Sequence, residues 1–115
     1  MEQMNRIELR GNVGTASLNA VGDTQVLRFT LATNYVYKDK EGNAVIETTW
    51  HNVSAWEGRG MPDLGRIEKG ACVHVIGRLK NNKYTNADGV EKQFWEVQAQ
   101  QLEIEEEPCK SQVNF

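Results

Sequence analysis

The fold of this chain depends most on one stretch, Glu47-Thr48-Thr49-Trp50-His51-Asn52-Val53-Ser54-Ala55-Trp56-Glu57. It is rich in β-branched and aromatic residues and contains no glycine or proline, which predicts a β-strand. Side chains alternate between the two faces of a strand. One face therefore carries Trp50, Asn52, Ser54 and Trp56, and the other carries Thr49, His51, Val53 and Ala55. The second set is small and partly apolar, which suits a core or a subunit contact.

The two indoles are the unusual feature of this strand. Trp50 and Trp56 lie six residues apart on its polar face, which is about 20 Å along an extended chain. A single tryptophan is more often a core residue, so packing is the alternative interpretation. Two indoles on one polar face favour a ligand instead, because monomers seldom expose such a pair. A flat aromatic face on a β-surface suits stacking on nucleic-acid bases.

Length and composition predict one globular domain. The chain has 115 residues, and 25% of them are charged, which argues against disorder over most of its length. No apolar run is long enough to cross a bilayer, and no basic-then-apolar leader opens the sequence. We therefore expect no membrane association and a cytoplasmic location. The domain should cover residues 1–104, with residues 105–115 as a short acidic and polar tail that is disordered.

The two cysteines lie in different contexts. Cys72 falls in an apolar strand pattern, which predicts a buried thiol, and Cys109 falls in the polar tail, which predicts a free one. Clustered Cys and His spacing is absent, so neither a disulfide framework nor a zinc site is expected.

The net charge of −3 argues at first against a nucleic-acid-binding protein. Three of the 16 acidic residues lie at 105–107 and one of the 13 basic residues is Lys110, which leaves residues 1–104 with 13 acidic and 12 basic side chains. A nearly neutral domain can still carry a basic groove. Its binding should be weaker and less salt-dependent than that of a strongly basic domain.

Alternating patterns predict four further strands, at residues 5–13, 24–34, 71–80 and 94–104. Residues 35–46 and 81–93 contain turn sequences flanked by residues that can extend the strands, and each predicts a long hairpin arm. Residues 15–23 are small and polar and end in a Gly22-Asp23 turn.

Between the third and fourth strands, residues 58–70 contain Pro62 and four glycines, which leave room for only a short helix. Leu64 and Ile67, at i and i+3, should face the core, and Gly70 should end the helix.

Five strands with a helix between the third and fourth predict an all-β, five-stranded Greek-key barrel, the OB-fold. An up-and-down barrel needs more strands, and an immunoglobulin sandwich needs about seven.

Five segments in order also resemble bacterial single-stranded DNA-binding proteins, in register from about residue 4 to residue 104. They are Asn5-Arg6-Ile7-Glu8-Leu9-Arg10-Gly11-Asn12-Val13-Gly14, Phe29-Thr30-Leu31-Ala32-Thr33-Asn34, Thr49-Trp50-His51-Asn52-Val53, Lys69-Gly70 and Val75-Ile76-Gly77-Arg78-Leu79. The resemblance implies an OB-fold that assembles as a homotetramer and binds single-stranded DNA with little sequence preference. It further implies protection of single strands in replication, recombination and repair.

The resemblance also implies site residues. The family's stacking positions fall on Tyr37, Trp50, Trp56 and Tyr84, and its subunit-contact histidine falls on His51. Four lysines stand beside these aromatic residues and should contact phosphates: Lys38, Lys40, Lys80 and Lys83.

Two departures from the family pattern matter. Asn52 and Glu57-Gly58 stand where members of the family often have basic residues, so phosphate contacts at these positions are not implied. The long linker with an acidic tip is absent, so recruitment of repair proteins through the tail is not implied.

Two other classes of function stay open. One is an OB-fold accessory protein of replication restart that acts mainly as a protein-interaction module; the paired indoles argue against it. The other is an enzyme such as a nuclease. His51 and His74 fall in strands expected to be packed, and the acidic residues lack metal-ligand spacing, so we expect no catalytic residue, metal or cofactor.

Overall fold

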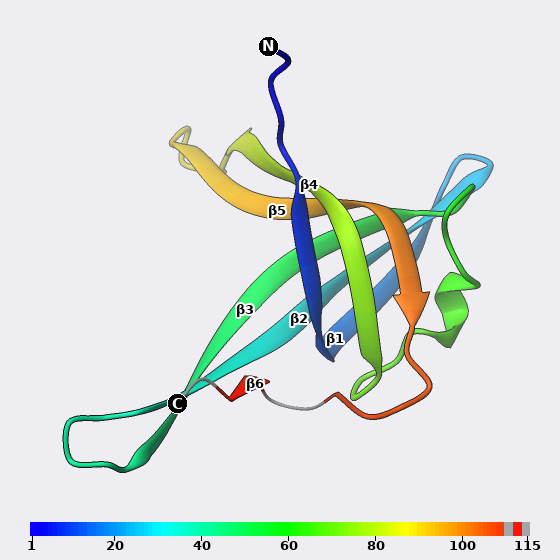
Figure 1. Cartoon of the computed structure of the whole chain (residues 1–115). Coiled ribbons are helices and arrows are strands. Elements are labelled where there is room, and N and C mark those ends of the chain that lie inside the picture. Colours follow the sequence, from blue (N-terminus) through cyan, green and yellow to red (C-terminus); the bar gives the residue numbers. More distant parts are fainter. Residues whose placement is uncertain (110–111, 114–115) are drawn as a thin grey trace.

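Five long strands form a closed barrel in the computed structural model, which describes residues 1–109 and 112–113 (Figure 1). The strands are β1 (Ile7–Val21), β2 (Thr24–Lys38), β3 (Ala44–Trp56), β4 (Cys72–Thr85) and β5 (Glu91–Ile104). They are ordered β1-β4-β5-β3-β2, and a β1–β2 pairing closes the barrel. Only β3 and β5 pair in parallel among these five. The predicted five-stranded OB-fold barrel is confirmed.

The core consists of the inward faces of these strands. Leu27, Phe29 and Leu31 of β2 are at most 3% exposed, as their alternation with polar neighbours predicts. Val73 and Val75 of β4 are fully buried and face them across the barrel. Burial of this apolar surface is the main force that closes the barrel.

Gly77 allows two strands to approach closely. A Cβ atom at this position would overlap the backbone carbonyl of Gln98 on β5. The β4–β5 register shifts between Ile76 and Gly77, which bends the ribbon at a bulge. The glycine therefore permits the curvature that a small barrel requires.

The segment 15–21, whose structure the sequence pattern left open, extends β1 into a long hairpin with β2. Val21 pairs with Thr24 across the predicted Gly22-Asp23 turn, and Gly22 has a φ of 60°. Residues 15–21 are all exposed. Without a buried face the segment has no apolar alternation, so its strand character was not predicted.

The predicted short helix is a single 3₁₀ turn, η1 (Leu64–Arg66). The Asp63 side chain accepts a hydrogen bond from the Gly65 amide, at 3.0 Å, and caps this turn. Leu64 and Ile67 are 3% and 4% exposed, so the predicted inward orientation is confirmed.

Two hairpin arms project from the barrel, one formed by β2 and β3 and the other by β4 and β5 (Figure 1). They raise the radius of gyration to 16.4 Å, whereas a compact chain of this length has about 13 Å. The turn at residues 86–89 follows its prediction, because the Asn86 side chain accepts from the Asp88 and Val90 amides.

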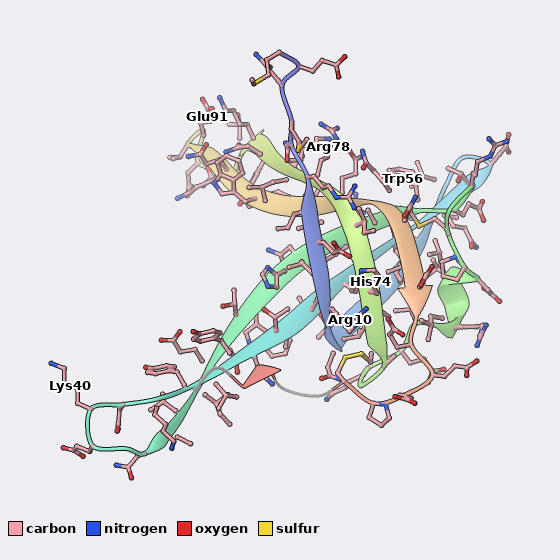
Figure 2. All side chains as sticks on the ribbon, in the orientation of Figure 1. Arg10, Lys40, Trp56, His74, Arg78 and Glu91 are labelled. Carbon is pink, nitrogen blue, oxygen red and sulfur yellow. A yellow bond between two sulfur atoms is a disulfide. The ribbon has the colours of Figure 1, made fainter. Side chains whose placement is uncertain are left out.

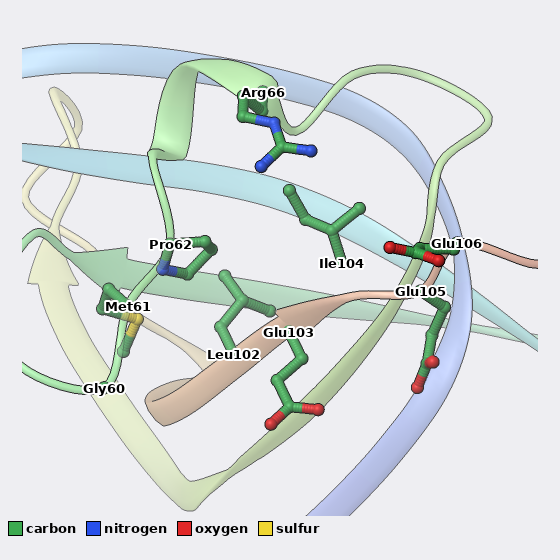
Figure 3. A pocket seen from close by; sticks show the side chains of 9 residues that line it. All are labelled: Gly60, Met61, Pro62, Arg66, Leu102, Glu103, Ile104, Glu105 and Glu106. Atoms are coloured by element: carbon green, nitrogen blue, oxygen red, sulfur yellow. The ribbon is translucent and has the colours of Figure 1, made fainter.

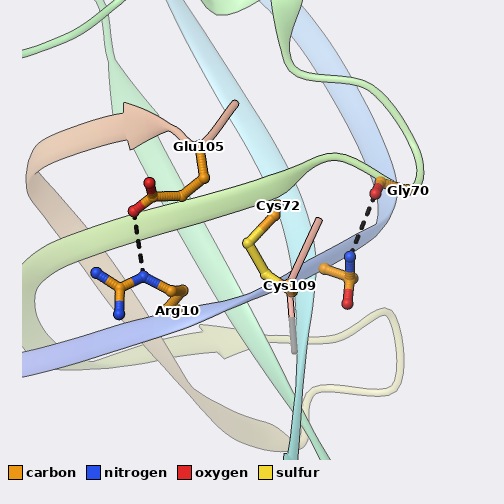
Figure 4. The surroundings of a disulfide bond; sticks show 6 residues. Arg10, Gly70, Cys72, Glu105 and Cys109 are labelled. Carbon is orange, nitrogen blue, oxygen red and sulfur yellow. Dashed lines mark hydrogen bonds and ion pairs between the residues drawn. A yellow bond between two sulfur atoms is a disulfide. The ribbon is translucent and has the colours of Figure 1, made fainter. Parts of the chain in front are cut away.

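The prediction of free thiols is wrong, because Cys72 and Cys109 form a disulfide (Figure 4). Residues 105–107 bring Cys109 back to the start of β4, where the Glu105 amide donates to the Cys72 carbonyl at 2.8 Å. Arg10 contacts the Glu105 carboxylate at 3.1 Å beside it. The pairing joins residues 37 positions apart, and only the path of the tail makes it possible.

A two-residue strand, β6 (Gln112–Val113), pairs in parallel with Tyr35 and Val36 of β2. Residues 110–111 and 114–115 lie outside the described residues. The domain boundary at residue 104 and the disorder of the tail stay predictions. Within the described residues, no helix is long and apolar enough to cross a membrane.

Candidate functional site

The predicted alternation of β3 is confirmed. Trp50 is 60% exposed and Trp56 is 37% exposed, whereas Val53 and Ala55 on the opposite face are buried. Ser54 shares the tryptophan face but is buried, opposite Arg28 on β2 and Gln98 on β5. The two indoles thus stand on the outer surface of the barrel wall.

Trp50 lies directly over Gly14 of β1. A Cβ atom at Gly14 would lie 2.5 Å from Cζ3 of the indole and 2.7 Å from Oγ1 of Thr30. The missing side chain therefore provides the space in which the ring packs. The six-membered ring of the indole packs against β1, and the large exposed fraction leaves the rest of the side chain open to a ligand.

Tyr84 stands on the outer face of the β4–β5 arm together with an aromatic residue that the sequence interpretation missed. The ring of Phe94 lies edge-on to that of Tyr84, with centroids 6.1 Å apart, and both are about half exposed. Lys92 lies directly opposite Tyr84, and Asn82 opposite Phe94. The hairpin register set by the Asn86–Gly89 turn, extended along the arm, could have identified Phe94 and Lys92.

Of the two lysines predicted on this arm, Lys80 shares the outer face of Tyr84, because the two positions are four residues apart on one strand. Lys83 lies on the other face, opposite Gln93. That face also carries Trp95, which is 56% exposed and was likewise missed by the sequence interpretation.

The pairing of β3 with β5 joins the two aromatic groups into one surface. Val53 pairs with Val97 and Ser54 with Gln98, so the outward faces of the two strands belong to the same side of the sheet. The outer surface of β3, β5 and β4 thus carries a set that we call the aromatic face: Trp50, Trp56, Phe94 and Tyr84.

Tyr37 does not join this surface. It pairs with Val45, five residues before Trp50, and the β2–β3 register is unbroken between them, so the two rings point to opposite faces of the ribbon. Tyr37 is half-buried, and its ring centroid lies 6.0 Å from that of Tyr35, which is 42% exposed.

The other two predicted lysines lie at the end of the β2–β3 arm. Lys38 is exposed and ends β2. Lys40 lies in the turn at the tip, far from Trp56 at the other end of β3 (Figure 2). The Asp39 carboxylate accepts from the Glu41 and Asn43 amides, at 2.9 Å each, and orders this turn.

His51 lies on the face opposite the indoles, as predicted. Its Nε2 is 2.9 Å from Oγ1 of Thr33, and partial burial lowers the pKa of the imidazole below 6.5. His74 lies elsewhere, on the outer surface of β4, with Nε2 2.6 Å from the Glu8 carboxylate. The described residues contain no group of three or more His, Cys, Asp or Glu side chains that could hold a metal ion.

A hollow of about 750 Å³ lies beneath the η1 turn, and no residue of the aromatic face lines it (Figure 3). Arg66 extends over Ile104, while the carboxylates of Glu103, Glu105 and Glu106 lie around the same hollow. Three carboxylates against one guanidinium disfavour a polyanion here.

Known proteins resemble this chain over most of its length. The model of the family described as "Single-strand binding protein family" matches residues 4–105. A protein named "Single-stranded DNA-binding protein" from Xanthomonas campestris pv. campestris is 33% identical over 103 residues, which cover 88% of this chain and 60% of that protein. The mitochondrial "Single-stranded DNA-binding protein 1-B" of Xenopus laevis is 33% identical over 101 residues, which cover 78% of this chain and 68% of that protein.

A solved structure has the same fold. It is described as "Plasmodium falciparum SSB complex with ssDNA" and superimposes with a TM-score of 0.77 at 26% identity, covering 92% of this chain and 98% of the other. The chain spans less than two thirds of the Xanthomonas relatives, matching 60% of one and 57% of another.

Proposed function

Because this chain belongs to the single-strand binding protein family, we propose that it binds single-stranded DNA on the aromatic face. The observation that carries the proposal is the pair of exposed indoles on β3, one of them seated on Gly14. Every base has a π-face, so stacking on Trp50, Trp56 and Tyr84 would be largely independent of sequence. Duplex DNA hides these base faces, so the protein should select single strands.

Lysines around the aromatic rings would contact the phosphates. Lys80 lies on the face of Tyr84, so it can contact the backbone of a strand stacked there. Lys83 lies on the other face of that arm, and Lys38 and Lys40 lie at the end of the second arm. These three would bind DNA only where the strand passes around an arm.

Tyr37 would belong to the same wrapped path. Its ring points away from Trp50, so a strand that stacks on both must cross the edge of the β2–β3 arm. The arms that project from the barrel offer edges around which a flexible single strand can bend (Figure 1).

The proposal also covers the oligomeric state and the cellular role of the protein. His51 lies at a half-buried position opposite the indoles, where it could pack at a subunit contact without blocking the aromatic face. We place the protein, as a homotetramer without cofactor, on exposed single strands during replication, recombination and repair in the bacterial cytoplasm.

The proposal is tested by titrating tryptophan fluorescence with oligo-dT at low and high salt, with a duplex of equal length as control. The expected result is quenching by the single strand alone that partly survives high salt, because salt screens phosphate contacts but not stacking. Trp95→Phe removes the signal of the indole outside the aromatic face. Absence of quenching in this variant would refute stacking and favour a protein-interaction module.

A further inference from the structure

A hollow of about 310 Å³ opens on the aromatic face, between the outer surfaces of β1, β2, β3 and β5. Phe94 and Glu96 line it from β5, Asn52 from β3, and Arg28 from β2. Its volume is at the lower end of small-ligand sites, which suits a single nucleobase.

Glu96 is unexpected on a surface proposed to bind a polyanion. Its cross-strand neighbour on β4 is Lys80, which could neutralise it. Among the described residues, however, the Glu96 side chain forms no ion pair or hydrogen bond. Glu96 lines the hollow, and its ionised carboxylate can only accept hydrogen bonds.

Two other polar side chains of the hollow are also uncommitted. Across residues 1–109, neither Arg28 nor Asn52 has a side-chain hydrogen bond or ion pair. The hydroxyl groups of Thr15 and Thr30 lie 3.1 Å apart and form a hydrogen bond with one another, so they line the hollow without recognising a ligand. The residues that line the hollow thus include one acceptor, Glu96, and one donor, Arg28, that have no partner among the described residues.

This pattern matches guanine best, because guanine alone offers two adjacent donors to one carboxylate, whereas cytosine and adenine offer only an amino group. A carboxylate can accept from the N1–H and the 2-amino group of guanine together, and a guanidinium can donate to O6 or N7. Thymine offers a single N–H between two carbonyl oxygens, which would face the carboxylate unfavourably. Phe94, held edge-on by Tyr84, supplies an aromatic surface for the same base.

We infer that this hollow is a pocket for one guanine base of the bound strand, an inference that rests on the proposed function. The protein then binds all single strands through stacking, and it favours the register that places a guanine between Phe94, Glu96 and Arg28. A single dG in a dT strand should raise the affinity roughly 5- to 150-fold at the position that reaches the pocket.

The test scans one dG along a labelled dT strand and measures binding by fluorescence anisotropy. Wild-type protein should bind most tightly at a limited set of positions. Glu96→Gln should abolish this preference, while the variant still binds all-dT because the stacking residues are unchanged. Deoxyinosine, which lacks the 2-amino group, should lose most of the gain.

The matched control is Glu91→Gln, because Glu91 is exposed on the same strand but on its other face, and this variant should keep the preference. Equal affinity at all dG positions, or a preference for dG that survives Glu96→Gln, would overturn the proposal of a guanine pocket. Tight binding of free guanosine monophosphate together with position-independent binding of the strands would assign the pocket to a mononucleotide instead. Failure to bind any strand, all-dT included, would overturn the proposed function itself.

Discussion

The contact between Gly14 and Trp50 leads to a sharp prediction for the variant Gly14→Ala. The added methyl group would lie 2.5 Å from Cζ3 and 2.9 Å from Cη2 of the indole, so the ring must move. Gly14 does not have a positive φ, so alanine fits its backbone. The change therefore displaces the stacking surface while the strand stays intact.

The expected loss of affinity is that of one stacked base. Stacking contributes about 1–3 kcal/mol per base, a range that comes from proteins of this same family rather than from this structure. This corresponds to a decrease in affinity of roughly 5- to 150-fold. The methyl group also lies 2.7 Å from Oγ1 of Thr30, which accepts from the Thr15 amide. Loss of that hydrogen bond costs about 0.5–1.5 kcal/mol of stability, so the protein should remain folded.

Anisotropy of a labelled oligo-dT at high salt measures this loss with the charge contribution screened. Gly65→Ala is the matched control, because its methyl group would lie at an ordinary 3.4 Å from the Asp63 carboxylate, away from the aromatic face. A double-mutant cycle with Trp50→Ala then isolates the coupling between the two positions.

In the Trp50→Ala background, Gly14→Ala should have no further effect, because the ring it displaces is gone. The reasoning is refuted if Gly14→Ala binds like wild type. It is equally refuted if the loss is the same with and without Trp50, since Gly14 would then act by another route.

Three further predictions follow from the same structure. At high salt Trp56→Ala should weaken oligo-dT binding more than Lys40→Ala does, because salt screens the phosphate contact; equal losses would count against stacking. Cys109→Ser should lower the free energy of unfolding by about 3–4 kcal/mol, because the disulfide to Cys72 closes a 37-residue loop and restricts the unfolded chain. A Tm that is the same with and without a dithiol reductant would contradict the disulfide. Burial lowers the pKa of His51 below 6.5, so the unfolded chain binds a proton first as the pH falls, and the free energy of unfolding should decline below about pH 6.5. Urea unfolding at about pH 7.5 and about pH 5.5 measures this decline, which should be smaller for His51→Gln than for wild type.

Much of the fold could be predicted from neighbours in sequence. Alternation of apolar and polar residues placed the core of β2 and β4, and the Gly22-Asp23 and Asn86–Gly89 turns marked two hairpin reversals. The orientation of Trp50 and Trp56 followed from the same two-residue period. These features depend on backbone geometry and local side-chain chemistry, which act within a few residues.

The sequence interpretation failed where a feature depends on contacts between distant segments. The hairpin at residues 15–21 buries neither face, so it has no apolar pattern to detect. The disulfide depends on the return of the tail to β4, which no spacing of two cysteines reveals. Phe94 was assigned to the last strand without a role, because its place beside Tyr84 follows only from the arm's register.

The sequence by itself therefore determined the five strands that carry a buried face, the side of β3 that carries the indoles, and the family that the chain resembles. Only the tertiary structure decided that Tyr37 turns away from Trp50, that Gly14 supports its ring, and that Glu96 and Arg28 meet in one hollow. The physical reason is that alternation along a strand is local. Which strands become neighbours is decided by closure of the barrel around its common core.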